Sequence, residues 1–140
     1  MSDTFFQLVD QDVARNPVAR AIQRRTVDSS MRTFRISLYQ LEDGAVEGEA
    51  IQAAAKVLAV ALRVLQVRRD DSSPPARVMR GAMSALVSRA EHGFRWRKAD
   101  APAVDVAMGY AVDVHGAAKA VELQAAWAYV HRLEREAAPA

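Results

Sequence analysis

The residues of this chain best suited to chemistry with a partner are its arginines. Of the 19 basic residues only Lys56, Lys98 and Lys119 are lysines, and arginines gather in the segment 15–35. The guanidinium group is a rigid fork of donors that matches phosphate and carboxylate oxygens. The clustering therefore indicates an anionic partner, although GC-rich coding DNA, which the abundant alanine also fits, produces the same bias without one.

Most of these arginines would share one face of a helix. They occupy a sector of about 140° at 100° per residue, interrupted only by Asp28. The members are Arg20, Arg24, Arg25, Arg32 and Arg35. Such a face suits the phosphates of a nucleic acid, because affinity grows with each phosphate that is neutralised. The sequence favours a solvated face that pairs with Glu42, Glu47, Glu49 or the acidic start of the chain, and both interpretations stay open.

A second basic segment, Phe94-Arg95-Trp96-Arg97-Lys98, alternates aromatic and cationic side chains. Aromatic rings that stack on bases, with cations that hold phosphates, form a single-stranded nucleic-acid site. The same alternation is typical of a loop whose rings point into the core while its charges point out. The sequence favours this core plug and keeps Arg95, Trp96, Arg97 and Lys98 as candidate contacts for an anion or a partner.

Catalytic and metal-binding patterns are absent from the sequence. No pair among His92, His115 and His131 has the spacing of three or four residues that a helical metal site uses. The chain has no cysteine, no glycine-rich phosphate loop and no nucleophile placed beside a base. We therefore expect no catalytic residues, no metal, no cofactor and no enzymatic activity.

Helical periodicity runs through almost the whole chain and predicts an all-α fold of about five helices in one domain, residues 1–140. Turns are predicted at Asn16-Pro17, Gly44, the run from Asp70 to Pro75, and Pro102. The predicted helices are Thr4–Ala14, Asn16–Leu41, Gly48–Arg69, Pro75–Glu91 and Ala103–Glu136. The third and fifth are expected to be the central pair of a small bundle.

The last predicted helix indicates self-association. It would span about 45 Å, more than a compact domain of this size needs, with kinks allowed at Gly109 and Gly116. Its apolar residues form two stripes, and excess apolar surface is usually buried against a partner. We therefore expect a homo-oligomer, most simply a dimer. Its predicted interface residues are Tyr110, Val114, Val121, Leu123 and Trp127.

The expected cellular location depends on two sequence signals, a signal peptide and a membrane-spanning stretch. The acidic N-terminus has no signal-peptide pattern, and the longest apolar stretch, Val57 to Val67, is interrupted by Arg63 and Gln66. We expect no membrane partner and a cytoplasmic protein.

Two functions fit these features. The first is a non-enzymatic interaction protein, structural or regulatory, whose oligomeric body docks through its arginines on another protein or acidic surface. The alternative is a nucleic-acid-binding module that uses the arginine face and the segment 94–98. Basic blocks that pair off inside the fold favour the first function, and blocks that converge on one surface favour the second.

Overall fold

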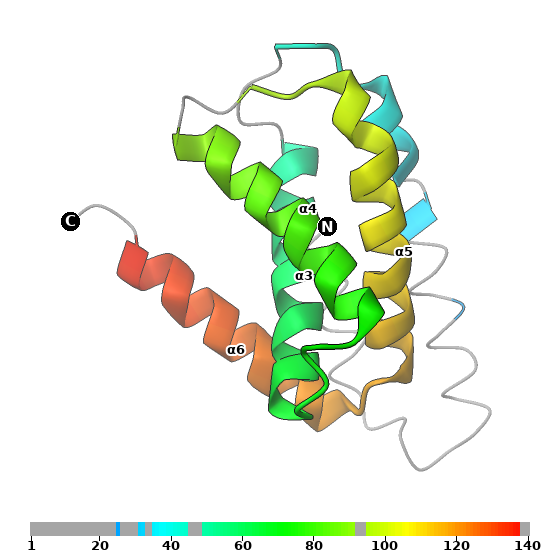
Figure 1. Ribbon diagram of the computed structural model, residues 1–140. Helices are drawn as coiled ribbons and strands as arrows, with labels where there is room; N and C mark the ends of the chain where they lie inside the picture. The colour runs from blue at the N-terminus through cyan, green and yellow to red at the C-terminus, as the bar shows by residue number, and fades with distance from the viewer. Residues whose placement is uncertain (1–24, 26–30, 33–34, 45–48, 92–94, 138–140) are drawn as a thin grey trace.

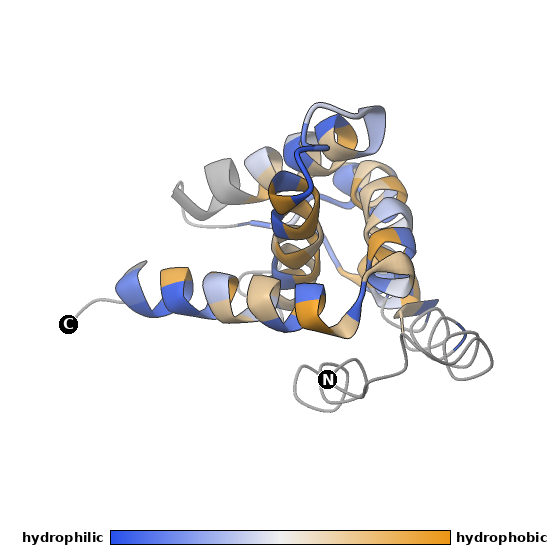
Figure 2. Ribbon diagram, turned by 90° about the horizontal axis from the view of Figure 1, so that it is seen from below, coloured by the Kyte–Doolittle hydropathy of each residue, from blue (hydrophilic) through white to orange (hydrophobic). Residues whose placement is uncertain are grey.

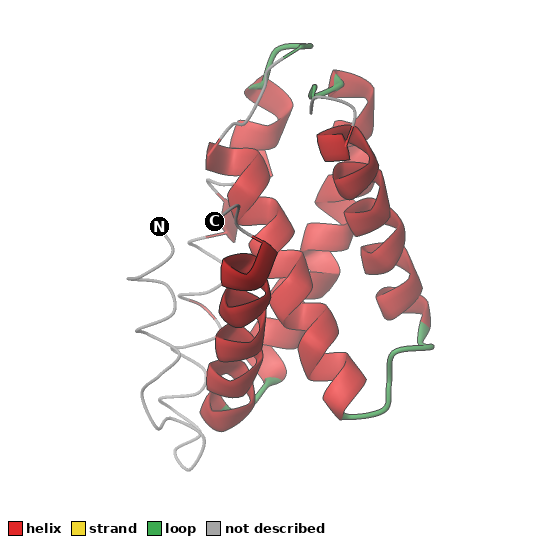
Figure 3. Cartoon of the chain, turned by 90° about the vertical axis from the view of Figure 1, so that its left-hand side faces the viewer, coloured by secondary structure: helices red, strands yellow, loops and turns green. Residues whose placement is uncertain are grey.

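The computed structural model describes residue 25 and residues 31–32, 35–44, 49–91 and 95–137. Every regular element in these ranges is helical, so the predicted all-α class is confirmed for the part of the chain that they cover (Figure 3). The elements are a helical segment 35–40, α3 (Glu49–Val67), α4 (Pro74–Glu91), the 3₁₀ turn η1 (Lys98–Asp100), α5 (Ala101–Ala117) and α6 (Ala120–Ala137). The predicted first helix and most of the second lie outside the described residues.

Helix α3 packs against α4, α5 and α6 (Figure 1). Its apolar arc is wide enough for three neighbours, because buried residues recur along the helix on more than one side. In the end-on view of Figure 2 this mostly hydrophobic helix lies in the middle of the bundle. The fully buried side chains of α3 include Leu58, Val60 and Ala61.

Alanines explain how the helices come close together. Buried alanines occur on every helix from α3 to α6, among them Ala61, Ala82, Ala107 and Ala126. An alanine side chain separates two helix backbones by little more than a methyl group and loses no rotamer entropy on burial. The alanine content of the sequence therefore contributes to close packing, whatever its cause in the coding DNA.

The turn from α3 to α4 is built by local hydrogen bonds. Arg69 adopts a left-handed backbone with φ 58°. Its N–H donates to the Gln66 carbonyl (3.0 Å), and the N–H of Asp70 donates to the Leu65 carbonyl (2.8 Å). This pair of bonds is the Schellman arrangement that ends a helix. At the start of α4 the Ser73 hydroxyl accepts from the Ala76 N–H (3.4 Å), as an N-cap does.

The prediction of one continuous last helix was wrong. Helix α5 ends at Ala117 and α6 begins at Ala120, so the chain breaks at Ala118 and Lys119. Ala118 has an extended backbone (φ −73°, ψ 150°). The Glu122 carboxylate accepts from the Lys119 N–H (3.0 Å) and caps the first turn of α6. Neither residue of the break is a helix breaker, and the kink allowed at Gly116 lies two residues before it, so the sequence pattern pointed to this region but not to two separate helices.

One helix bears on the expectation about membranes. The window Ala50–Val67 of α3 is long and apolar enough, by length and composition, to cross a bilayer. The expectation from the sequence rested on an uninterrupted apolar run, which is a narrower criterion and missed this window. In the structure α3 packs against three other helices, which is also the arrangement of a core helix in a bundle.

Candidate functional site

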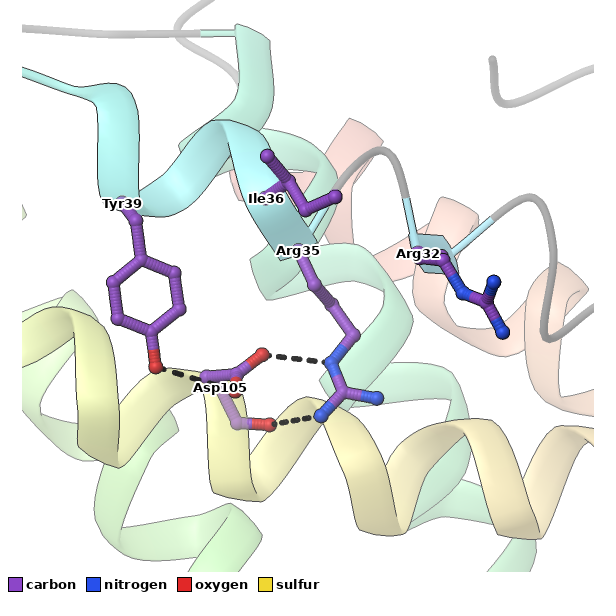
Figure 4. A pocket seen from close by; sticks show the side chains of 5 residues that line it. All are labelled: Arg32, Arg35, Ile36, Tyr39 and Asp105. Carbon is purple, nitrogen blue, oxygen red and sulfur yellow. Dashed lines mark hydrogen bonds and ion pairs between the residues drawn. The ribbon is translucent and has the colours of Figure 1, made fainter.

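A surface hollow lies between the helical segment 35–40 and helix α5. Its volume is about 310 Å³. It is lined by Arg32, Arg35, Ile36, Tyr39 and Asp105. Arg35, Ile36 and Tyr39 come from the helical segment 35–40, and Arg32 is helical as well. Arg35 and Tyr39 are four residues apart, which places them on one face of the segment. Figure 4 shows Arg35 and Tyr39 pointing toward Asp105 of α5, whereas Ile36 points away from it.

Asp105 is the anion of this hollow, and two side chains bind it. The Arg35 Nε–H donates to Asp105 Oδ1 at 2.7 Å, and Arg35 Nη2 donates to the Asp105 carbonyl oxygen at 3.4 Å. The Tyr39 hydroxyl donates to Asp105 Oδ2 at 3.3 Å. The pKa of Tyr39 is raised above its ordinary value of 10.0, first by partial desolvation and then by the negative charge of Asp105 beside it. At neutral pH the Tyr39 hydroxyl is protonated and donates.

The Arg35 guanidinium lies against α5 at Gly109. A Cβ on this residue would meet Arg35 Nη2 at 3.4 Å, so the guanidinium lies directly over the glycine, one turn beyond Asp105. The ion pair keeps partial contact with water, because about a third of the Arg35 side chain and a quarter of the Asp105 side chain are exposed. One of the predicted anion-binding arginines is thus already neutralised by an acid of the same chain.

The rest of the hollow faces solvent with mixed chemistry. Arg32 is exposed and has no ion-pair partner among the described residues. Ile36 is 52% exposed and Tyr39 is 45% exposed. A cation beside an aliphatic and an aromatic side chain is a composition that protein interfaces favour at their centres.

The other arginines of the predicted face do not line this hollow. Arg25 is helical and exposed. Arg20 and Arg24 lie outside the described residues. The acids predicted from the sequence to pair with this face were Glu42, Glu47, Glu49 or those of the first segment. For Arg35 the acid is instead Asp105, 70 residues along the chain.

The segment 95–98 is attached to the turn at Asp43 and Gly44. The Gly44 N–H donates to the Trp96 carbonyl oxygen (2.9 Å), and the Lys98 N–H donates to Asp43 Oδ1 (2.5 Å). Trp96 itself is fully buried, as the core-plug interpretation requires, and a buried ring offers no face for stacking on a base. Its indole Nε1 finds no acceptor among the described residues. Arg95, Arg97 and Lys98 are exposed.

Two basic residues elsewhere in the chain form ion pairs with helix α6. The Arg68 guanidinium donates two hydrogen bonds of 2.6 Å to the Glu122 carboxylate. These bonds lower the pKa of Glu122 to about 2, and the same bonds raise the pKa of Arg68. Lys56 Nζ lies 3.3 Å from Glu134 Oε1. These charges therefore cross-link helices of one chain.

The predicted interface residues of the last helix fall into different environments. Leu123 is fully buried inside its own chain, so in this form it offers no surface to a partner, and its place in an oligomer interface stays a prediction. Tyr110, Val114 and Trp127 are half-buried and pack against the core. Val121 is 66% exposed and is the one member of this predicted set that is open to solvent.

The histidines do not form a metal or catalytic grouping in the part of the chain that the structure describes. Among these residues no group of three His, Cys, Asp or Glu side chains is placed to hold a metal ion. His115 is buried in the core, whereas His131 stacks on Trp127 with ring centroids 5.7 Å apart. His92 lies outside the described residues. Neither described histidine lines the hollow at Asp105.

Three residues of the hollow, Ile36, Tyr39 and Asp105, were not anticipated. Asp105 and Tyr39 carried no signal in the sequence, because an aspartate in an amphipathic helix and a tyrosine near a helix end are both common. The available clue was the spacing of Arg32 and Ile36, which are four residues apart. This spacing places an arginine and an apolar side chain together on one helix face, as a protein-binding face would have them. The acid that meets it depended on how α5 packs.

No protein-family model matches the chain, and neither the curated proteins nor the solved structures contain a significant match to it. The function must therefore be inferred from its own residues.

Proposed function

We propose that this chain is a non-enzymatic helical interaction protein, structural or regulatory, that self-associates and docks on another protein through the face formed by Arg32, Ile36 and Tyr39. We place it in the cytoplasm. The docking face offers one cation and two exposed apolar surfaces side by side. Its partner would present a carboxylate next to an apolar side chain, because these two groups complement Arg32 and Ile36.

The observation that carries this proposal is the internal pairing of the basic residues. Arg35 is paired with Asp105, Arg68 with Glu122 and Lys56 with Glu134, in each case across more than 50 residues of sequence. A nucleic-acid surface gains affinity from cations that remain available to phosphates. Because Arg35, Arg68 and Lys56 are paired with acids of the same chain, they are less available to phosphates. This supports docking on a protein over binding of a polyanion.

A comparison of two matched variants tests the docking face. Ile36→Asp places a charge at the centre of the face, and Val67→Asp places the same charge at an exposed site outside it. We expect a partner captured from cell extract by the wild-type chain to be retained by the Val67→Asp chain and lost by the Ile36→Asp chain. Equal retention by both variants would contradict the docking face, provided circular dichroism shows that both are folded.

Nucleic-acid binding is the second candidate, and the exposure of Arg32, Arg97 and Lys98 favours it. It requires that log affinity for an oligonucleotide falls with log salt, with a slope of about −0.7 to −0.9 per phosphate neutralised. Replacing Arg32 with Ala would then flatten this slope by about one unit if Arg32 contacts a phosphate. Absence of binding to duplex and single strands at low salt would remove this candidate and leave docking on a protein.

A further inference from the structure

Helix α6 is attached to the rest of the molecule on one side. Among the described elements, α3 is the one with which it shares an extensive contact. Leu123 and Ala126 are buried in this contact, and Trp127 and Val130 pack on its edge. Figure 1 shows that α6 leaves the bottom of the bundle and runs at an angle to α3.

Polar contacts give this α3–α6 pairing a defined register. The helices run antiparallel, since Arg68 at the end of α3 meets Glu122 at the start of α6, and Lys56 meets Glu134 near the opposite end. Between them the Arg63 guanidinium lies 3.7 Å from the centroid of the Tyr129 ring. A bidentate ion pair and a cation–π contact are directional, so α6 recognises this particular surface of α3.

The connection between α5 and α6 consists of Ala118 and Lys119 alone. Both are strong helix formers, and the extended ψ of 150° at Ala118 is what separates the two helices. Rotation of this residue to a helical ψ would join α5 and α6 into one helix over residues 101–137, about 55 Å long at 1.5 Å per residue. In that form α6 points away from its own α3 and leaves the complementary face of α3 open.

We propose that α6 exchanges between two copies of this chain: the break at Ala118-Lys119 straightens, and α6 of each copy packs on α3 of the other. The partner that fits the α3 face is thus a second copy of the same helix. All α3–α6 contacts are kept in the exchanged form. The two states therefore differ mainly in the backbone conformation of the hinge and in the translational and rotational entropy that two copies lose on association. The inference rests on the self-association proposed above and gives its structural basis.

Charge reversal at one ion pair tests the exchange. The Arg68→Glu variant opposes two negative charges at the contact between positions 68 and 122, and the Glu122→Arg variant opposes two positive charges there. In each variant alone this contact is therefore repulsive, both in the closed monomer and in an exchanged homodimer. In an exchanged heterodimer, α3 of the Glu122→Arg copy brings Arg68 to Glu122 on α6 of the Arg68→Glu copy, as in the wild type. At the other contact the two substituted side chains meet, a negative one at position 68 and a positive one at position 122. Both contacts therefore join opposite charges. The variants are unfolded together in urea, refolded, and examined by native mass spectrometry. We expect heterodimers above the proportion that random pairing gives.

The double variant Arg68→Glu/Glu122→Arg is the matched control. It restores an opposite-charge pair within its own chain, but an exchanged heterodimer with wild type would oppose like charges at both sites. We therefore expect this mixture to give heterodimers below the random proportion. A random proportion in both mixtures would overturn the exchange while leaving self-association intact. A wild-type chain that stays monomeric by light scattering at all concentrations would overturn both.

A hinge variant provides a second readout. Ala120 is the first residue of α6, where proline is tolerated because the first N–H groups of a helix need no partner within it. In the continuous helix the same proline would lie in the interior and disrupt it. We expect Ala120→Pro to keep the helical circular dichroism of the wild type and to lose the dimer by light scattering. A folded Ala120→Pro chain that dimerises as the wild type does would contradict the straightened hinge.

Discussion

The Nε2 atom of His115 in α5 lies 3.1 Å from the carbonyl oxygen of Val57 in α3. A carbonyl oxygen only accepts, so Nε2 carries the hydrogen and donates it. His115 is fully buried. Burial lowers its pKa to about 4 and outweighs the hydrogen bond to Val57, which acts in the opposite direction. The side chain is therefore a neutral polar link between two core helices.

This relationship predicts acid sensitivity. The folded pKa of about 4 lies below the unfolded value of 6.5, so the unfolded chain binds the proton first as pH falls. The stabilisation is complete above pH 6.5 and declines as pH falls toward 4, with a total loss of about 3 kcal/mol. Urea unfolding at several pH values measures it. His115→Gln should remove this part of the pH dependence, whereas His131→Gln, at an exposed site, should leave it unchanged. A slope that survives in His115→Gln would contradict the assignment.

Truncation of Trp96 should destabilise the fold. A fully buried tryptophan replaced by alanine loses about 3–5 kcal/mol through lost contacts and the cavity left behind. The midpoint of thermal unfolding, followed by circular dichroism, should fall by many degrees. The neighbouring Arg97→Ala, at an exposed position, should change the free energy of unfolding by no more than about 0.5 kcal/mol. Equal stability of the two variants would mean that the ring is not a core plug.

Left-handed backbone at two positions predicts opposite effects of substitution. Gly44 has φ 86°, and a Cβ added there would meet no atom within 4 Å, so Gly44→Ala meets only backbone strain and should cost about 1–2 kcal/mol. Arg69 bears this backbone strain in the wild type, at φ 58°. Glycine adopts a positive φ without steric cost, so Arg69→Gly should raise the free energy of unfolding by up to about 1 kcal/mol. Urea unfolding of both variants checks the two signs. Stabilisation by Gly44→Ala would contradict the turn geometry.

Loss of the Glu122 carboxylate should weaken the start of α6. Glu122→Gln removes a bidentate ion pair with Arg68 and weakens the cap on Lys119, and we expect a loss of about 1 kcal/mol at pH 7. Because the pKa of Glu122 is lowered to about 2, this stabilisation is present above pH 4.5 and is lost as pH falls through about 2. The difference in unfolding free energy between wild type and variant should shrink over that range.

Glu134→Gln serves as the comparison for Glu122→Gln. Its ion pair with Lys56 is a single contact of 3.3 Å, and about half of the Glu134 side chain is exposed. Screening by water makes such pairs worth less than about 0.5 kcal/mol. A larger loss for Glu134→Gln than for Glu122→Gln would contradict the ranking of the two contacts.

In the part of the chain that the structure describes, the sequence by itself determined the helical class and most helix boundaries. Periodic apolar residues, the run Asp70 to Pro75 and the proline at 102 are local signals, and α3 and α4 follow them within a residue or two. The same kind of local reasoning favoured Trp96 as a core plug, since apolar rings in a polar segment gain free energy by burial.

Only the tertiary structure decided the break at Ala118-Lys119, the burial of Leu123 and the pairing of Arg35 with Asp105. Local propensity favours a continuous helix at the break, but packing of α6 on α3, with Arg68 bound to Glu122, overrides a preference of a few tenths of a kcal/mol per residue. Long-range ion pairs depend on which helices become neighbours, and charge patterns along a sequence carry no information about that. The physical reason is that helix formation is governed by neighbours along the chain, whereas the surface left for a partner is what remains after the helices have packed.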